Sequence, residues 1–292
     1  MKVWIVLYNN VYIEYFGTKE WEEDTKYVKE KYNINLTFMN KNYFEIKIVD
    51  NKSKLFYENK EIIDLPKFVI FRTSAGILGS FLEVNDIKYI NSVKSTQITS
   101  SKALTHVYLS KIGIKTPATI LNYSSRIEDY NFNEIQKELG ENFILKANSG
   151  YGGDNVYVIK SAEEFYKLLE DYNCNCIFQK NIVSSYGKDI RVTVIGKKHI
   201  KSFIRENKND FRSNLHLGGT ATLFECSEEM KNISIKIANY LNLGICGIDF
   251  LIGENGEYYV AEVNSAPVFQ RNITSLTYSL LIDILVKENF FN

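Results

Sequence analysis

The stretch 246–264 carries the residues whose types and spacing suggest chemistry most directly. Asn255-Gly256 is a strong signal for a two-residue hairpin turn, which would place Asp249 directly opposite Glu262. In a four-residue turn, Asp249 would instead pair with the residue two positions before Glu262. Both registers leave Asp249, Glu262 and Asn264 on one face of the hairpin. Facing carboxylates repel each other, and we expect that only a cation relieves this repulsion; oxygen ligands of this kind suit Mg²⁺. In the alternative interpretation, one carboxylate points to solvent at a sheet edge.

A glycine-rich loop is the second chemical feature, and it follows a predicted strand that ends at Lys146. Its key residues are Ser149, Gly150, Gly152 and Gly153. Glycines allow backbone N–H groups to turn inward around an anion, and the lysine adds a point charge. The lysine precedes the glycines and no helix opens directly after them, so the loop is not of the Walker A type. We predict a flap over phosphate groups, with an ordinary hairpin turn as the alternative.

Two further segments place polar residues beside predicted strands. A short apolar strand ends at Gln179, where backbone groups could face an adenine edge while Asp189 accepts from ribose hydroxyls. The alternative is an ordinary strand pair with surface charges. The chain has only six arginines, so an arginine indicates a position that needs a planar guanidinium group with two parallel N–H donors. We interpret Arg205 and Arg212 as a pair suited to phosphoryl or carboxylate oxygens, and His216 as a local hydrogen-bonding residue.

The elements that must position these residues alternate between strands and helices. The first 90 residues read as a small α/β unit, with a strand at 3–8 and a helix at 19–31. Further on we predict helices at 100–112, 132–139, 162–170, 228–241 and 276–287, and strands at 143–146, 156–159, 177–179, 190–195 and 199–205. This mixed order with hairpins indicates α+β subdomains rather than a regular βαβ array.

Composition limits the functions that remain. With 292 residues, of which 45% are hydrophobic, the chain can bury a substantial core, which excludes disorder. The formal net charge of zero gives no basic excess for holding a nucleic-acid backbone. No apolar run reaches the roughly 18 residues of a membrane span, and the four cysteines form no C-x-x-C pair. We therefore expect a cytoplasmic protein that binds neither nucleic acid nor membranes.

In combination, these motifs resemble the ATP-grasp superfamily, and within it the RimK-like carboxylate–amine ligases, a group that includes alpha-L-glutamate ligases. The resemblance is carried by Asp210-Phe-Arg-Ser-Asn-Leu-His-Leu-Gly-Gly219 and by Gly247-Ile-Asp249 ahead of Glu262-Val-Asn264-Ser-Ala-Pro267. It implies an ATP-grasp fold of the α+β / α/β class, in which two α+β subdomains grip ATP. The implied segments are 1–92 for a small α/β pre-ATP-grasp domain, 93–180 for the central subdomain and 181–292 for the C-terminal subdomain.

The resemblance also implies roles for individual residues. The nucleotide phosphates would be held by Lys102 and Lys146 and covered by Ser149, Gly150, Gly152 and Gly153. The ribose would be bound by Asp189, and the adenine by the hinge residues Gln179, Lys180, Asn181 and Ile182. Two Mg²⁺ ions, with Mn²⁺ as an alternative, would be held by Asp249, Glu262 and Asn264. The carboxylate that accepts the phosphoryl group would be lined by Arg191, Arg205, Arg212 and Asn214, with Arg72 facing the same cleft. The sequence departs from the family pattern at Lys180, where relatives carry an acidic residue, and at Val268, where they carry glycine.

The implied function is an ATP-dependent carboxylate–amine ligase. A carboxylate attacks the γ-phosphorus of ATP to give an acyl phosphate and ADP, and an amine then displaces phosphate. Such an enzyme positions reactants and neutralises charge, which fits a chain without a convincing nucleophilic triad. The implied partners are a carboxylate substrate on a protein, a peptide or a small metabolite and an amino-acid or peptide amine; a homo-oligomer is a further expectation. A kinase and a non-catalytic nucleotide-binding protein are the alternatives for the same site.

Overall fold

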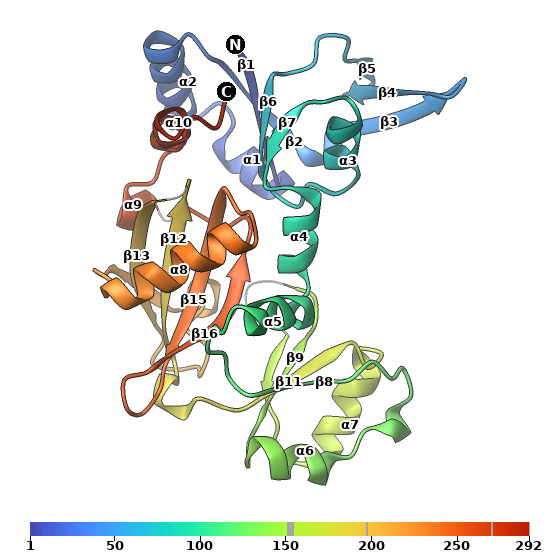
Figure 1. The fold of residues 1–292 in the computed structure, drawn as a ribbon, viewed down its shortest axis with the longest axis vertical. Helices are drawn as coiled ribbons and strands as arrows, with labels where there is room; N and C mark the ends of the chain where they lie inside the picture. Colours follow the sequence, from blue (N-terminus) through green and yellow to red (C-terminus); the bar gives the residue numbers. More distant parts are fainter. Residues whose placement is uncertain (151–154, 197, 270, 292) are drawn as a thin grey trace.

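The computed structural model describes residues 1–150, 155–196, 198–269 and 271–291. They form an α/β unit at the N-terminus and two further parts, each with an antiparallel sheet and covering helices (Figure 1). The α/β unit and the α+β subdomains predicted from the sequence are therefore confirmed. In the part of the chain that is described, no helix is both long and apolar enough to cross a lipid bilayer.

The N-terminal unit is built on a parallel sheet with the strand order β2-β1-β6-β7. Its strands are β1 (Lys2–Leu7), β2 (Asn35–Asn40), β6 (Phe68–Arg72) and β7 (Lys88–Ile90). The central strands β1 and β6 are nearly continuous apolar runs because both of their faces are buried. One face packs against α1 (Asn9–Tyr15) and α2 (Lys19–Tyr32). The other packs against α3 (Gly76–Val84) and a small antiparallel sheet of β3 (Phe44–Val49), β4 (Lys52–Tyr57) and β5 (Lys60–Glu61).

Two helices, α4 (Val93–Ser100) and α5 (Lys102–Lys111), lead from this unit to the central sheet (Figure 1). The single helix predicted at 100–112 is wrong, because Ser101 leaves the helical conformation and its hydroxyl oxygen accepts from the N–H of Leu104. The break gives α5 an N-cap of its own. It also ties the start of α5 to the glycine loop, since Lys102 N–H donates to the carbonyl of Asn148 at 2.9 Å.

The central part is an antiparallel sheet of order β10-β9-β11-β8 with two helices on one face. The strands are β8 (Thr119–Leu121), β9 (Ile144–Ala147), β10 (Val156–Val158) and β11 (Cys176–Gln179), and the helices are α6 (Phe132–Leu139) and α7 (Ala162–Asp171). Phe143, Phe165 and Phe178 form the core between this sheet and its helices. Strand alternation places Lys146 and Gln179 on the opposite face, away from that core.

The C-terminal part is a five-stranded antiparallel sheet of order β14-β13-β12-β15-β16. Its strands are β12 (Lys188–Ile195), β13 (His199–Glu206), β14 (Thr220–Leu223), β15 (Ile245–Ile252) and β16 (Tyr258–Asn264). The apolar face packs against α8 (Glu228–Tyr240), and the last helices are α9 (Arg271–Thr274) and α10 (Tyr278–Lys287). Short 3-10 helices lie at η1 (Lys41–Tyr43), η2 (Ile127–Asp129), η3 (Val183–Ser185) and η4 (Leu215–Leu217).

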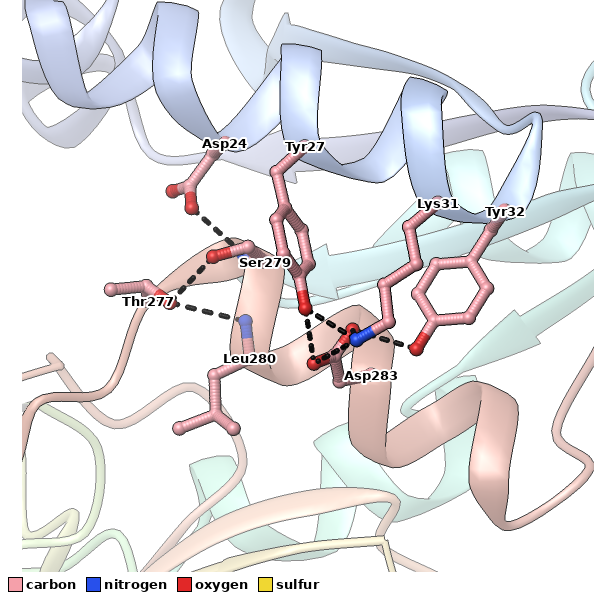
Figure 2. Close-up of polar contacts among 8 residues, drawn as sticks. All are labelled: Asp24, Tyr27, Lys31, Tyr32, Thr277, Ser279, Leu280 and Asp283. Carbon is pink, nitrogen blue, oxygen red and sulfur yellow. Dashed lines mark hydrogen bonds and ion pairs between the residues drawn. The ribbon is translucent and has the colours of Figure 1, made fainter.

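Helix α10 leaves the C-terminal sheet and packs beside α2 of the N-terminal unit (Figure 1). Asp283 on α10 accepts hydrogen bonds from Tyr27 at 2.9 Å and from Tyr32 at 2.7 Å, as Figure 2 shows. The carboxylate of Asp24 on α2 in turn accepts from the N–H of Ser279 at 2.9 Å. Residues from both ends of the chain therefore share one core with the N-terminal sheet.

Candidate active site

A cavity of about 130 Å³ is lined by residues of both the central and the C-terminal sheets. The central sheet and its neighbouring loops contribute Pro117, Ile144, Lys146, Val156, Gln179, Lys180, Asn181 and Ile182. The C-terminal part contributes Asp189, Arg205, Arg212, Asn214, Asp249, Leu251 and Glu262, among others. The cavity is therefore lined by both apolar and charged side chains, which suits a small ligand with an apolar and a charged part.

The hairpin of β15 and β16 supplies the acidic pair. Asp249 lies directly opposite Glu262, so this predicted pairing is confirmed. The predicted two-residue turn is wrong: Gly253 N–H bonds to the carbonyl of Glu257 at 2.8 Å, which closes a three-residue loop. Gly256 takes φ +80° in that loop, a conformation that glycine adopts without steric cost.

A β-bulge in the same hairpin restores the pairing that the longer loop would have shifted. Phe250 pairs with Val260, whereas Asp249 pairs with Glu262, so Ala261 is the extra residue. In a ladder without the bulge, Ala261 would face Asp249, and Glu262 would point to the apolar face. The bulge therefore aims Glu262 at the cavity.

Asp249 is held by two arginines, which the sequence alone did not indicate. Arg191 lies opposite Asp249 on β12, with Nη2 2.7 Å from Oδ2 and a second contact through Nε. Arg205 on β13 lies opposite Asp189, with Nε 2.7 Å from Oδ1, and its Nη2 is also 3.0 Å from Oδ2 of Asp249. The expectation that only a metal ion relieves the charge of Asp249 is therefore wrong. Burial alone would raise the pKa of Asp249, but Arg191 and Arg205 outweigh it and hold the pKa below its usual range.

Lys146 lies on β9 at the centre of the cavity lining and is half-buried. Burial lowers its pKa to about 8, with Glu262 and Asp249 opposing this shift and Lys102 adding to it. The Nζ of Lys102 donates to the carbonyl of Gly150 at 3.2 Å, which places this second lysine at the base of the glycine loop. Gly152 and Gly153 lie outside the described residues.

Gln179, which lines the cavity, contacts a buried polar group that sequence reasoning missed. His106 on α5 is 5% exposed, and its Nε2 lies 2.8 Å from Nε2 of Gln179. Burial, together with the charges of Lys146 and Lys102, lowers the pKa of His106 to about 3. The only sequence signal was its position one helical turn after Lys102, which places both residues on one face of a helix.

The other predicted residues lie at or near this cavity. Arg212 lines it and pairs with Asp210, with Nη2 2.8 Å from Oδ2. Asn214 and the hinge residues also line the cavity. Arg191 does not line it, but it contacts Asp249, which does. The residues that do not contribute to the lining are Lys102, Ser149, Gly150, Asn264 and Arg72. Arg72 is 7% exposed; its guanidinium donates to the carbonyl of Pro267 and lies 4.0 Å from the ring centre of Phe269.

Comparison with known proteins decides the family, because the profile of the RimK-like ATP-grasp domain matches residues 99–286. The chain belongs to the RimK-like ATP-grasp family. A Coxiella burnetii protein named as a probable alpha-L-glutamate ligase is 33% identical over 207 residues, which is 68% of this chain and 67% of that protein. "Uncharacterized protein MG012" of Mycoplasma genitalium is 28% identical over 98% of this chain and 99% of its own length.

Solved structures show that the RimK-like domain and the N-terminal unit together form the ATP-grasp ligase fold. A Chryseobacterium gregarium RiPP-associated ATP-grasp ligase, solved with ADP and a leader and core peptide, superposes with a TM-score of 0.71 at 18% identity, covering 98% of this chain and 97% of that one. The D-alanine–D-alanine ligase of Bacillus anthracis, solved with ATP, gives 0.67 at 18% identity, covering 99% and 97%. The ATP-grasp fold predicted from the motifs is confirmed. This RimK-like protein is an ATP-dependent enzyme that joins a carboxylate to an amine.

Proposed function

We propose that the cavity between the two sheets binds Mg²⁺–ATP. Its base would lie against the apolar side chains of the lining, and its phosphates would face Lys146 and the acidic pair. One observation carries this assignment: Lys146, Asp249 and Glu262 line the same cavity as the apolar side chains of Ile144 and Val156. In this proposal Lys180, Asn181 and Ile182 contact adenine, Asp189 lies near the ribose, and the phosphates are covered by the loop of Ser149, Gly150, Gly152 and Gly153.

The residues of the hairpin fit a hard divalent cation. Glu262 has no hydrogen bond or ion pair among the described residues, and Nδ2 of Asn264 is buried without a partner. No cluster of three or more His, Cys, Asp or Glu side chains that could hold a metal ion occurs within the described ranges, so the set depends on Asn264 as its third member. We propose Asp249, Glu262 and Asn264 as ligands of two Mg²⁺ ions, for which Mn²⁺ could substitute. The metal would neutralise phosphate charge in the transition state.

Charge balance supports binding of a nucleotide together with its metal ions. The cations that face the acidic pair are Lys146, Arg191 and Arg205, and the anions are Asp189, Asp249 and Glu262. Three positive and three negative groups leave this cluster close to neutral. A bare triphosphate would therefore meet nearly as much repulsion as attraction at this cluster, whereas the two proposed Mg²⁺ ions together offset the negative charge of ATP. This balance favours Mg²⁺–ATP over free ATP as the species that binds.

The reaction that we propose for these groups is phosphorylation of a carboxylate, followed by attack of an amine. The carboxylate oxygen bonds to the γ-phosphorus as the bond to the β-phosphate oxygen breaks, which yields an acyl phosphate and ADP. The amine then bonds to the acyl carbon, phosphate leaves, and the amine loses a proton. Arg212 and Asn214 would position the carboxylate, and Arg205 and Arg191 would hold the acidic pair in place. Positioning and charge stabilisation supply the rate enhancement without a nucleophilic side chain.

We infer that the acceptor is a peptide-like carboxylate and the donor an amino-acid or peptide amine. The named relatives support this class, since one is a probable glutamate ligase and another binds a leader and core peptide. A reaction that consumes ATP also supports the cytoplasmic location. The segments 1–92, 93–180 and 181–292 expected from the sequence stay predictions. A homo-oligomer stays a prediction.

Hydroxylamine trapping separates the ligase from a kinase. With Mg²⁺–ATP, a carboxylate acceptor and hydroxylamine, a ligase forms a hydroxamate and releases ADP and phosphate. A kinase acting on a hydroxyl acceptor retains the phosphate on its product and forms no hydroxamate. ADP release that needs no carboxylate would contradict the proposal.

A further inference from the structure

The hairpin of β3 and β4 projects from the N-terminal unit, and one of its edges is open (Figure 1). In the sheet β3-β4-β5, β3 pairs with β4 on one side and with no strand on the other, within the described part of the chain. The opposite edge of this sheet is blunted, because β5 has only two residues. β3 has six residues, and Ile48 near its end is 76% exposed. A long edge strand with apolar side chains is a template for pairing with another strand.

The turn between β3 and β4 determines which backbone groups reach the open edge. Asp50-Asn51 takes φ of 50° and 61°, as in a two-residue type I′ turn, so the closing pair of Val49 and Lys52 is hydrogen-bonded. Hydrogen-bonded and non-hydrogen-bonded pairs alternate along an antiparallel ladder. The residues of β3 whose N–H and C=O groups point away from β4 are therefore Phe44, Ile46 and Ile48.

A contact on the far side of β4 agrees with this alternation. Leu55 lies opposite Ile46, and its carbonyl accepts from the N–H of Ile62 at 2.8 Å, on the β5 side. The backbone of Leu55 is thus turned away from β3. Ile46 and Leu55 form a non-hydrogen-bonded pair, and the backbone of Ile46 faces the open edge.

Charge selects one register for a second copy of this chain on that edge. Two antiparallel β3 strands that share their outward groups must pair Phe44, Ile46 and Ile48 among themselves. If Phe44 pairs with Ile46, Glu45 lies opposite Glu45 of the second copy; if Ile46 pairs with Ile48, Lys47 lies opposite Lys47. Like charges directly opposite each other are unfavourable. If Ile46 pairs with Ile46, Glu45 lies opposite Lys47 on both sides of the axis, whereas registers centred on Phe44 or Ile48 leave much of the strand unpaired.

We propose that β3 pairs with β3 of a second copy, antiparallel and centred on Ile46, in a two-fold dimer. Its three hydrogen-bonded pairs contribute two backbone bonds each, and Phe44 of one copy lies beside Ile48 of the other. Within one chain Glu45 and Lys47 lie 3.2 Å apart and are 53% and 45% exposed, so both remain accessible to the second copy. A two-fold contact of identical strands closes on itself and does not extend into a fibre. No residue of β3 lines the cavity, so this interface is independent of the proposed function.

Matched proline variants on the two edges of the hairpin test the interface. A contact of one strand is small, so sedimentation equilibrium should show a mass that rises with concentration from 33.8 kDa toward twice that value. Ile48 and Ser53 are exposed and lie opposite each other in a non-hydrogen-bonded pair, so the N–H of each points away from the other. Proline is compatible with such edge positions. Ile48→Pro should raise the dimer dissociation constant at least about tenfold, because two interface bonds lose their donors, and Ser53→Pro should leave it unchanged.

Charge variants test the register. Glu45→Lys brings lysines together across the axis and Lys47→Glu brings glutamates together, so each variant alone should dimerise about tenfold more weakly. An equimolar mixture of the two should recover the dimer, because both contacts then join a lysine to a glutamate. Neither variant keeps the Glu45–Lys47 pair within its own chain, so recovery in the mixture cannot come from folding of the hairpin.

The outcomes separate the interface, its register and the proposed function. An unmodified protein that stays monomeric up to about 100 µM overturns the interface, as does a dimer that is equally strong in folded Ile48→Pro and in Ser53→Pro. A mixture that dimerises no better than its components overturns the register centred on Ile46. Circular dichroism melts show which variants fold, and the charge variants decide the question if Ile48→Pro does not. ADP binding should be the same in all of these variants, so its loss in the unmodified protein would affect only the proposed function.

Discussion

Arg205 faces Asp189 directly across β12 and β13, and its guanidinium contacts both carboxylate oxygens. The same group reaches Asp249 on β15, at 3.0 Å, across the intervening strand. One arginine that is 6% exposed thus bridges two buried acids. Its removal would leave both carboxylates without a cation that they now share.

Replacement of Arg205 by methionine should destabilise the protein strongly. Breaking a buried ion pair by removing one partner costs about 3–5 kcal/mol, because the other charge stays buried. Urea denaturation should show a loss of this size. Arg126→Met is the matched control, since Arg126 is 67% exposed and its pair with Asp129 should contribute no more than about 1 kcal/mol. Equal effects of the two substitutions would contradict the structural role of Arg205.

Arg205→Lys should also lose stability. A lysine keeps the charge, but its single nitrogen cannot reproduce the fork that meets Asp189 and Asp249 together. We expect a lowered melting temperature and strongly reduced ADP release. Unchanged melting with normal turnover would show that a point charge is sufficient at this position.

The pKa of Lys146, lowered to about 8 by burial, predicts a pH dependence of nucleotide binding. Phosphate binding needs the protonated lysine, so affinity for Mg²⁺–ADP should be nearly constant below about pH 7, fall about twofold by pH 8 and about tenfold by pH 9. Lys146→Ala should bind weakly throughout and lack this step, whereas Lys167→Ala, on an exposed position of α7, should behave like the unmodified protein. Titrations from pH 6.5 to 9.5 decide between them.

The lowered pKa of Lys146 also makes the stability of the fold depend on pH. The direction of this dependence is opposite to that of a lysine in an ion pair, whose pKa is raised. The folded pKa of Lys146 lies below its ordinary value of 10.5, so the unfolded chain binds more protons between about pH 8 and pH 10.5. The contribution of Lys146 to stability therefore rises with pH across this window. Lys146→Ala should flatten this part of the pH–stability curve.

Glu262→Gln should leave the metal-free protein as stable as before, because Arg191 and Arg205 already balance Asp249 and Glu262 has no partner to lose. The additional stability that ADP gives in the presence of Mg²⁺ should disappear, together with ADP release. Glu254→Gln, on an exposed position of the same hairpin, is the control. A normal Mg²⁺-dependent shift of the melting temperature in Glu262→Gln would rule out this residue as a metal ligand.

Asp283→Asn should loosen the contact between α2 and α10 (Figure 2). Burial alone would raise the pKa of Asp283, but hydrogen bonds from Tyr32, Tyr27 and Lys31 outweigh it and lower the pKa. Hydrogen bonds to a charged group contribute about 1.5–3 kcal/mol. This loss should be measurable at pH 7. It should begin to shrink below about pH 4 and disappear only as the pH falls through the lowered pKa of Asp283, where the carboxyl becomes protonated in the original protein as well.

Urea denaturation of Asp283→Asn at pH 7 and at about pH 2.5 checks both parts of this prediction. Asp64→Asn is the control, because Asp64 is 90% exposed and should change stability by no more than about 0.5 kcal/mol. An equal effect of Asp283→Asn at both pH values would mean that the charge of Asp283 does not contribute.

The sequence predicted the Asp249–Glu262 pair correctly but through a turn that does not form. A three-residue loop and a bulge at Ala261 each shift the register by one, and the two shifts cancel. Local patterns predict which residues share a face, because side chains alternate along a strand. They do not predict bulges, whose position depends on packing of both strands against the core.

Contacts between distant segments were also beyond sequence reasoning. Arg191 and Asp249 are 58 positions apart and meet only because β12 lies beside β15. His106 gave no metal or catalytic spacing, since its partner Gln179 is 73 positions away on another element. The motif residues could be recognised individually, but their mutual ion pairs follow from strand order, which a single sequence does not determine.

The position of α10 against α2 has a consequence for synthesis of the chain. Val3, Ile5 and Leu7 belong to the core that α10 completes with Leu281, Ile282 and Leu285. The first strand leaves the ribosome long before this last helix, so the part of the N-terminal core that α10 covers stays exposed while more than 200 residues are translated. Chaperone capture of the nascent chain would be most useful during this interval, and release would coincide with the emergence of residues 278–287.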